Sequence, residues 1–187
     1  MLLENDRRKI KRTAKESGYN KGTIKTNSTD GISDTRDTDV AFSSESYLYN
    51  LFSPLIHGAN EGAGWKYDID WFEPVQIARY KKNQHYAWHT DGPSDHFGSN
   101  TSDDRGGENF VGKVRKLSLI ACLSSEYVGG DLELALQRQD EPNEILYPKM
   151  ECGDVIVFPS YVFHRSTPIT KGVKYSAAIW CLGEPFK

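Results

Sequence analysis

The chain has 187 residues, of which 37% are hydrophobic and 26% are charged, and its formal net charge is -3 at neutral pH. This length suits one domain with a single core. We therefore predict one domain over residues 1–187, with a polar, partly flexible region over 1–40 and a helix followed by a β-barrel core over 41–187. The slight negative charge disfavours nucleic acid as a partner, and no apolar run approaches the ~20 residues of a membrane span.

The N-terminus lacks the apolar core and cleavage site of a secretory signal, which predicts a cytoplasmic protein. The three cysteines, Cys122, Cys152 and Cys181, are scattered and never spaced as a C-x-x-C pair. This spacing indicates buried free thiols rather than a disulfide framework or a zinc site.

Two helices are predicted before residue 60. Residues 2–17 read as a polar helix ended by Gly18, and the acidic residues among its basic ones favour a solvated face over a nucleic-acid contact. Residues 19–39 are polar and rich in turn formers. A packed helix follows, with Ser44 or Ser46 as its cap and Gly58 beyond its end.

After Trp71 the chain consists of short segments rich in β-branched and aromatic residues: "VQIARY", "KLSLIACL", "DLELAL", "DVIVFPS", "YVFHRS" and "KYSAAIW". Turn-forming residues separate these segments and no second long helix interrupts them. The pattern favours an antiparallel sandwich or barrel over alternating βαβ units.

The stretch "YAWHTDGP" places His89 and Asp91 on one face of a strand, about 6.6 Å apart along the backbone. The glycine and proline that follow indicate that the strand ends there, at a barrel mouth. Such a pair is weak alone and needs a third ligand. His164 lies between two strand-like runs and is favoured over His96 in a polar loop. Two histidines and one carboxylate suit Fe(II) with open positions, and zinc is the rival metal.

Lys174 lies ten residues after His164, and strand alternation places it on one face with Ser176, Ala178 and Trp180. A cation that faces inward is costly unless an anion meets it. At about 4 Å its attraction to a carboxylate is on the order of 4 kcal/mol, enough to help select a dicarboxylate co-substrate. The alternative is a surface lysine beside Lys171.

The segments "IARYKKNQHYAWHTD", "VRKLSLIACLSSEYVGGDLEL" and "GDVIVFPSYVFHRSTPITKGVKYSAAIW" together resemble the prolyl-4-hydroxylase-type Fe(II)/2-oxoglutarate dioxygenases, including their bacterial and phage members. The resemblance implies a mainly β fold with flanking helices, a double-stranded β-helix or cupin-like jelly roll. It also implies that His89, Asp91 and His164 are iron ligands and that Lys174 holds the distal carboxylate of 2-oxoglutarate.

The same resemblance implies roles for four other residues. Tyr80 and Tyr86 would contact 2-oxoglutarate, Ser118 would place a hydroxyl beside the lysine, and Trp180 would line the substrate pocket. Packing in a barrel is the alternative for each aromatic residue, and an ordinary strand serine the alternative for Ser118. No catalytic residue is assigned beyond the metal ligands. Asn83 stands in a turn where the family has glycine; asparagine tolerates left-handed geometry.

The implied reaction is hydroxylation of an unactivated C–H bond, on a prolyl residue of a peptide or protein, with O2 consumed and succinate and CO2 released. Ascorbate would serve as reductant. The alternatives are a hydroxylase of a free small molecule, a nucleic-acid dealkylating dioxygenase and, last, a non-enzymatic β-barrel binding module. A halogenase would need a small residue in place of Asp91. The sequence does not distinguish the substrates and is silent on oligomeric state.

The polar loop from Gly92 to Lys113 directly follows Asp91. Loops of about twenty residues are uncommon inside compact domains and are usually lids, binding loops or disordered. We predict a lid that closes over an extended peptide, with a tolerated surface insertion as the alternative.

Overall fold

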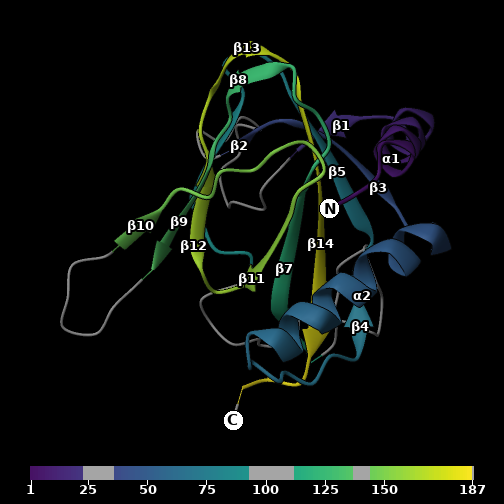
Figure 1. Ribbon diagram of the computed structural model, residues 1–187, viewed down its shortest axis with the longest axis vertical. Coiled ribbons are helices and arrows are strands. Elements are labelled where there is room, and N and C mark those ends of the chain that lie inside the picture. Colours follow the sequence, from purple (N-terminus) through teal and green to yellow (C-terminus); the bar gives the residue numbers. More distant parts are fainter. Residues whose placement is uncertain (23–35, 93–111, 137–143, 187) are drawn as a thin grey trace.

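The computed structural model describes residues 1–22, 36–92, 112–136 and 144–186 of the chain. Two antiparallel sheets face one another, and both helices cover the outer side of the larger sheet (Figure 1). The larger sheet has the order β1 (Asn20–Lys21), β3 (Asp39–Ser43), β5 (Val75–Tyr80), β14 (Lys174–Gly183), β7 (Val114–Cys122) and β11 (Val155–Pro159), and β4 (Trp71–Phe72) pairs with β14.

The smaller sheet has the order β10 (Glu144–Leu146), β9 (Leu132–Leu136), β12 (Phe163–Ser166), β6 (His85–His89) and β2 (Arg36–Asp37). A two-stranded ribbon of β13 (Ile169–Gly172) and β8 (Tyr127–Gly129) lies at one end of the molecule (Figure 1). All these pairings are antiparallel, so the mainly β character predicted from the short alternating segments is confirmed.

The first helix, α1 (Glu4–Ser17), ends where predicted, since Gly18 has a φ of 80° that glycine adopts without strain. The second, α2 (Ser46–Gly62), differs from the prediction at both ends. Glu45 is its N-cap and makes no side-chain cap bond, and the helix runs past Gly58 by another turn. Asn60 explains the extension: its buried side chain donates to Tyr67 O and accepts from Tyr67 N–H, which fixes the chain leaving the helix.

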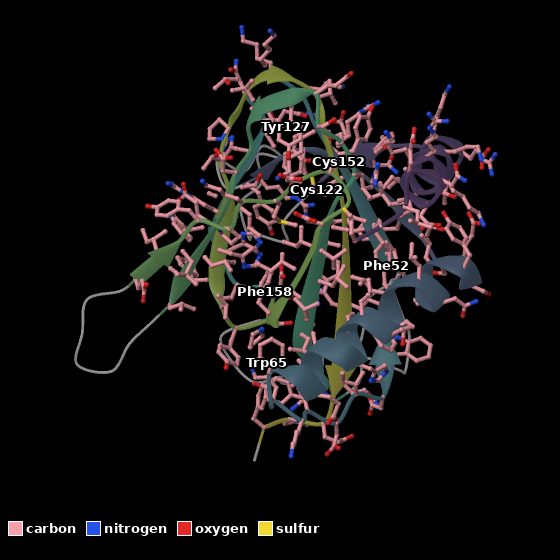
Figure 2. All side chains as sticks on the ribbon, in the orientation of Figure 1. Phe52, Trp65, Cys122, Tyr127, Cys152 and Phe158 are labelled. Atoms are coloured by element: carbon pink, nitrogen blue, oxygen red, sulfur yellow. The ribbon has the colours of Figure 1, made fainter. Side chains whose placement is uncertain are left out.

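The main core lies between the helices and the larger sheet. Ile10 of α1 and Phe52 of α2 are fully buried there against Leu117 and Ile179. A second apolar cluster, in which Phe158 packs with Leu132 and Leu134, lies between the two sheets (Figure 2). Side chains of both sheets pack in this cluster, and a pocket lies beside it between the sheets.

Two turns have a left-handed backbone, which was predicted for the one at Asn83. Asn83 has a φ of 69° in the turn before β6, and Gly129 and Gly130 have φ values of 78° and 68° before β9. Within the described residues all three cysteines are free, as predicted, although Cys152 is only partly buried. Most of the predicted lid lies in residues 93–111, outside the described residues, as do residues 23–35 of the polar N-terminal region.

Phe52→Ala is expected to lower the free energy of unfolding by about 3–5 kcal/mol, because the ring is wholly buried and its removal leaves a cavity. Phe42→Ala is the control, since Phe42 is 39% exposed on β3. Equilibrium denaturation in urea measures both. A loss below about 1 kcal/mol for Phe52→Ala would contradict this account of the core.

Candidate metal centre and co-substrate pocket

Three predicted ligands converge at one place. Asp91 Oδ1 lies 3.6 Å from His89 Nε2, and Asp91 Oδ2 lies 3.5 Å from His164 Nε2. Candidate ligand atoms of the three residues all lie within 4.8 Å of one another. The rival third ligand, His96, lies outside the described residues, so His164 is the histidine that the structure brings to the pair.

Strand pairing sets this convergence. His89 on β6 is the cross-strand partner of His164 on β12. Asp91 follows the end of β6, and its N–H donates to Ser160 O at the end of β11, 3.0 Å away. Both sheets therefore contribute to the position of the carboxylate, as expected for a site at a barrel mouth.

The histidine rings are oriented by their own strands. His89 Nδ1 lies 2.8 Å from Ala87 O, and His164 Nδ1 lies 2.9 Å from Val162 O. With each Nδ1–H donating to a carbonyl, each Nε2 presents a lone pair toward Asp91. A backbone carbonyl behind a histidine is the usual support for a metal-binding imidazole.

The charges suit a cation. Burial by itself raises the pKa of Asp91, but His164, His89 and Arg115 together hold it well below its usual range. Burial lowers the pKa of His164 despite the nearby carboxylate. Asp91 is therefore ionised and His164 neutral near pH 7, which are the forms that bind a metal.

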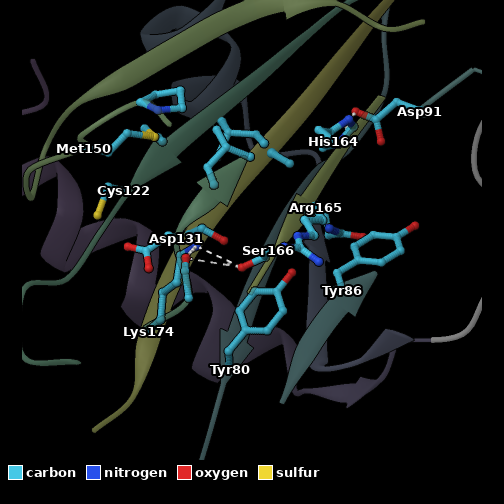
Figure 3. Close-up of a pocket in the computed structure, with 18 of the residues that line it drawn as sticks. Tyr80, Tyr86, Asp91, Cys122, Asp131, Met150, His164, Arg165, Ser166 and Lys174 are labelled. Carbon is cyan, nitrogen blue, oxygen red and sulfur yellow. Dashed lines mark hydrogen bonds and ion pairs between the residues drawn. The ribbon is translucent and has the colours of Figure 1, made fainter. Parts of the chain in front are cut away.

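A pocket extends from these residues between the two sheets to Lys174 on β14 (Figure 3). Lys174 Nζ donates to Gly130 O at 2.5 Å and to Ser166 Oγ at 3.2 Å, and it lies 5.6 Å from the centre of the Tyr80 ring. Among the described residues no carboxylate pairs with it. Burial lowers the pKa of Lys174 to about 8, although Cys122 and Asp131 act in the opposite direction.

Tyr86 reaches the pocket because of a β-bulge. The pairs His164–His89 and Ser166–Tyr86 are two residues apart on β12 but three apart on β6, so Tyr86 and His89 share a face. Their rings stack with centroids 3.5 Å apart. Burial raises the pKa of Tyr86 to about 12, against the nearby charge of Arg36, so its hydroxyl stays a donor. Tyr80 lines the same pocket, and burial raises its pKa too.

The structure does not bring Ser118 to the lysine. Its hydroxyl lies 2.9 Å from Ser160 Oγ, and its cross-strand partner on β14 is Trp180, six residues from Lys174. Ser166 provides the hydroxyl beside Lys174 instead. Trp180 does line the pocket. The co-substrate role of Ser118 thus stays a prediction without a contact to support it.

Sequence reasoning missed several residues of the site. Ser166 could have been found, because it lies two residues after His164 on the same strand face. Gly130 also belongs to the site, because its carbonyl oxygen accepts a hydrogen bond from Lys174. Glu73 and Arg115, whose ion pair lies beside Asp91, are 42 residues apart in the chain, and nothing in the sequence links them.

Comparison with known proteins places this site in a family. The family model of the 2OG-Fe(II) oxygenase superfamily matches residues 75–182, which include all three candidate ligands and Lys174. The chain belongs to the 2OG-Fe(II) oxygenase superfamily. Members of this superfamily use Fe(II), 2-oxoglutarate and O2, and a His-Asp-His group is present here.

The relatives of this oxygenase are hydroxylases. A PKHD-type hydroxylase of Janthinobacterium sp. (strain Marseille) is 28% identical over 110 residues, 58% of the chain and 43% of the relative. One of Xylella fastidiosa (strain M12) is 28% identical over 114 residues, 57% and 43% of the two chains. The chain therefore spans less than half the length of these curated relatives.

Solved structures confirm the predicted double-stranded β-helix. The viral collagen prolyl hydroxylase of Paramecium Bursaria Chlorella virus-1 has a TM-score of 0.65 and 19% identity, and the match covers 97% of this chain and 92% of that one. A prolyl-4-hydroxylase of Pseudomonas putida has a TM-score of 0.66 and 18% identity, and the match covers 98% of this chain and 89% of that one.

Neither helix in the described part of the chain is long and apolar enough to cross a membrane.

If Lys174 holds a carboxylate of 2-oxoglutarate, binding should depend on pH. The pKa of about 8 in the free chain means that the cation is lost as pH rises through 8. Affinity for 2-oxoglutarate in the presence of Mn(II) should therefore fall about tenfold between pH 7 and pH 9. Calorimetric titration measures this fall. Lys174→Arg should bind more weakly but without the pH dependence, because arginine keeps its charge; an equally flat profile for the unaltered chain would contradict the prediction.

Proposed function

We propose that the chain is an Fe(II)- and 2-oxoglutarate-dependent dioxygenase that hydroxylates a prolyl residue of a peptide or protein, with release of succinate and CO2. The observation that carries the proposal is one pocket that has the group of three candidate ligands at one end and a buried lysine at the other. Among the described residues this lysine, Lys174, forms no ion pair with a carboxylate. Ascorbate would keep the iron reduced.

The residues present fit both cofactors. His89, Asp91 and His164 offer two imidazole nitrogens and a carboxylate, the set that leaves positions open on Fe(II). Iron bound there with 2-oxoglutarate would supply the activation of O2 for C–H oxidation. Lys174 is only 8% exposed and lacks an anionic partner among the described residues, so a carboxylate would offset the cost of burying its charge.

The other pocket residues would orient the co-substrate and keep out water. Tyr80 and Tyr86 keep protonated hydroxyls, which would donate to carboxylate oxygens of the co-substrate. Ile120, Leu132 and Met150 give the pocket apolar walls, which suit the methylene groups of a dicarboxylate. Asp91 stays ionised at neutral pH and needs no proton transfer before it binds a metal.

The relatives support the substrate class. The viral and bacterial structures above are prolyl hydroxylases, and a third similar structure is a prolyl hydroxylase of Trichoplax adhaerens in complex with a hypoxia inducible factor peptide fragment (TM-score 0.60). That likeness supports a peptide or protein as the proposed partner. The negative net charge argues against the nucleic-acid dealkylating alternative.

The metal assignment predicts that His164→Ala lowers Fe(II) affinity at least 100-fold and abolishes 2-oxoglutarate turnover, because one of three protein ligands is lost. Anaerobic metal titration and succinate release measure the two effects. His96→Ala is the matched control and should keep both. The reverse result would show that the third ligand has been misassigned.

The substrate assignment is tested by mass spectrometry of a panel of proline-containing peptides incubated with Fe(II), 2-oxoglutarate and ascorbate. A gain of one oxygen on proline, matched by one succinate per product, is expected. Free proline and a methylated oligonucleotide test the alternatives in the same assay. Succinate release coupled only to a free small molecule would refute the peptide assignment while retaining the dioxygenase.

A further inference from the structure

We infer that Arg115, anchored by Glu73, is a positioning residue that sets the main chain of Asp91 and thereby the geometry of the metal site. The inference rests on the proposed metal function, since it concerns how one of the proposed ligands is held. Arg115 lies at the start of β7, and Glu73 lies between β4 and β5. Neither residue contributes a candidate ligand atom itself.

The ion pair is bidentate, and its carboxylate is buried. Arg115 Nε and Nη2 both donate to the Glu73 carboxylate, the second at 2.6 Å. Glu73 is 2% exposed, and its N–H donates to Trp180 O at 2.9 Å, which ties it to β14. The Arg115 guanidinium lies 4.2 Å from the centre of the Trp180 ring. The carboxylate and the ring thus fix the guanidinium plane.

The remaining nitrogen of the guanidinium group, Nη1, faces the metal site. Arg115 Nη1 donates to Asp91 O at 2.8 Å. Asp91 lies two residues beyond His89, where the pairing of β6 with β12 has ended, so the ladder no longer holds its backbone. The N–H bond to Ser160 O fixes one side of the residue, and Arg115 fixes the other.

Arginine is the side chain that can bridge the Glu73 carboxylate and the Asp91 carbonyl oxygen in a fixed geometry. Its planar group donates Nε–H and Nη2–H toward one carboxylate while Nη1–H points elsewhere, so the position of Glu73 is transmitted rigidly to Asp91. A lysine would keep the charge but has no planar group with which to bridge both acceptors in a fixed geometry. A buried ion pair contributes little net stability, so fold stability alone gives no strong reason for this one.

The chain contains a matched control. Arg79 on β5 donates through Nε and Nη2 to Asp39, at 3.3 and 2.9 Å, and lies 4.2 Å from the centre of the Tyr19 ring. This pair has the same chemistry and the same aromatic support as Arg115 and Glu73. In the described part of the chain this pair does not bond to the three candidate ligands, so Arg79→Lys reports the general cost of disturbing such a pair.

The experiment measures Co(II) binding to the full, metal-free chain by calorimetry and by the visible absorption of bound cobalt, without 2-oxoglutarate. Arg115→Lys should weaken Co(II) binding tenfold or more and alter the cobalt spectrum, as loss of an outer-shell support commonly does. Glu73→Gln should weaken it less, because the amide oxygen still accepts one bond. Arg79→Lys should leave affinity within twofold and the spectrum unchanged.

Thermal melting shows that each variant is folded at the temperature of titration, and Glu73→Gln decides the matter if Arg115→Lys does not fold. Co(II) affinity in Arg115→Lys and Glu73→Gln equal to that of Arg79→Lys would overturn the inference and leave an ordinary ion pair. Failure of the metal assignment is seen separately, as a chain that binds no Co(II), or one in which His164→Ala binds as well as the unaltered chain.

Discussion

The pairing of β6 with β12 is the interaction on which the site depends. It sets His89 opposite His164, and the bulge that follows turns Tyr86 to the same side as His89. A slip of β6 by one residue would turn His89 to the outer face of the sheet, away from His164. The register therefore determines whether any ligand group forms, and the rest of the smaller sheet maintains it.

Buried charge is the second constraint. Asp91 and Lys174 lie at the two ends of one pocket, and each is ionic without a direct ion pair to the other. Burial by itself raises the pKa of Asp91, but its neighbours His164, His89 and Arg115 lower it. Lys174 contacts two neutral oxygens, and burial lowers its pKa. Buried ionisable groups with shifted pKa values in a pocket are more typical of binding sites than of protein cores.

The larger sheet and its helices supply rigidity. Phe52 and Ile10 close its outer face, while β14 carries Lys174 and Trp180 on its inner face, six residues apart. Side chains on a central, doubly flanked strand hold their positions better than those on loops. Asp91 lies beyond the end of β6, and Arg115 donates to its carbonyl oxygen there.

The sequence by itself determined the local chemistry: the spacing of His89 and Asp91, the alternation that aligns Lys174 with Trp180, and the left-handed turn at Asn83. These features depend on the two-residue period of a strand and on the backbone preferences of single residues. Residues close together in the sequence are therefore enough to predict them. It misplaced the ends of α2, where the distant contact of Asn60 with Tyr67 prevails over the glycine signal. Only the tertiary structure decided that Ser166 rather than Ser118 meets Lys174, that a bulge brings Tyr86 inward, and that Glu73 reaches Arg115. Each of these depends on the register between strands far apart in the chain, which no single segment encodes.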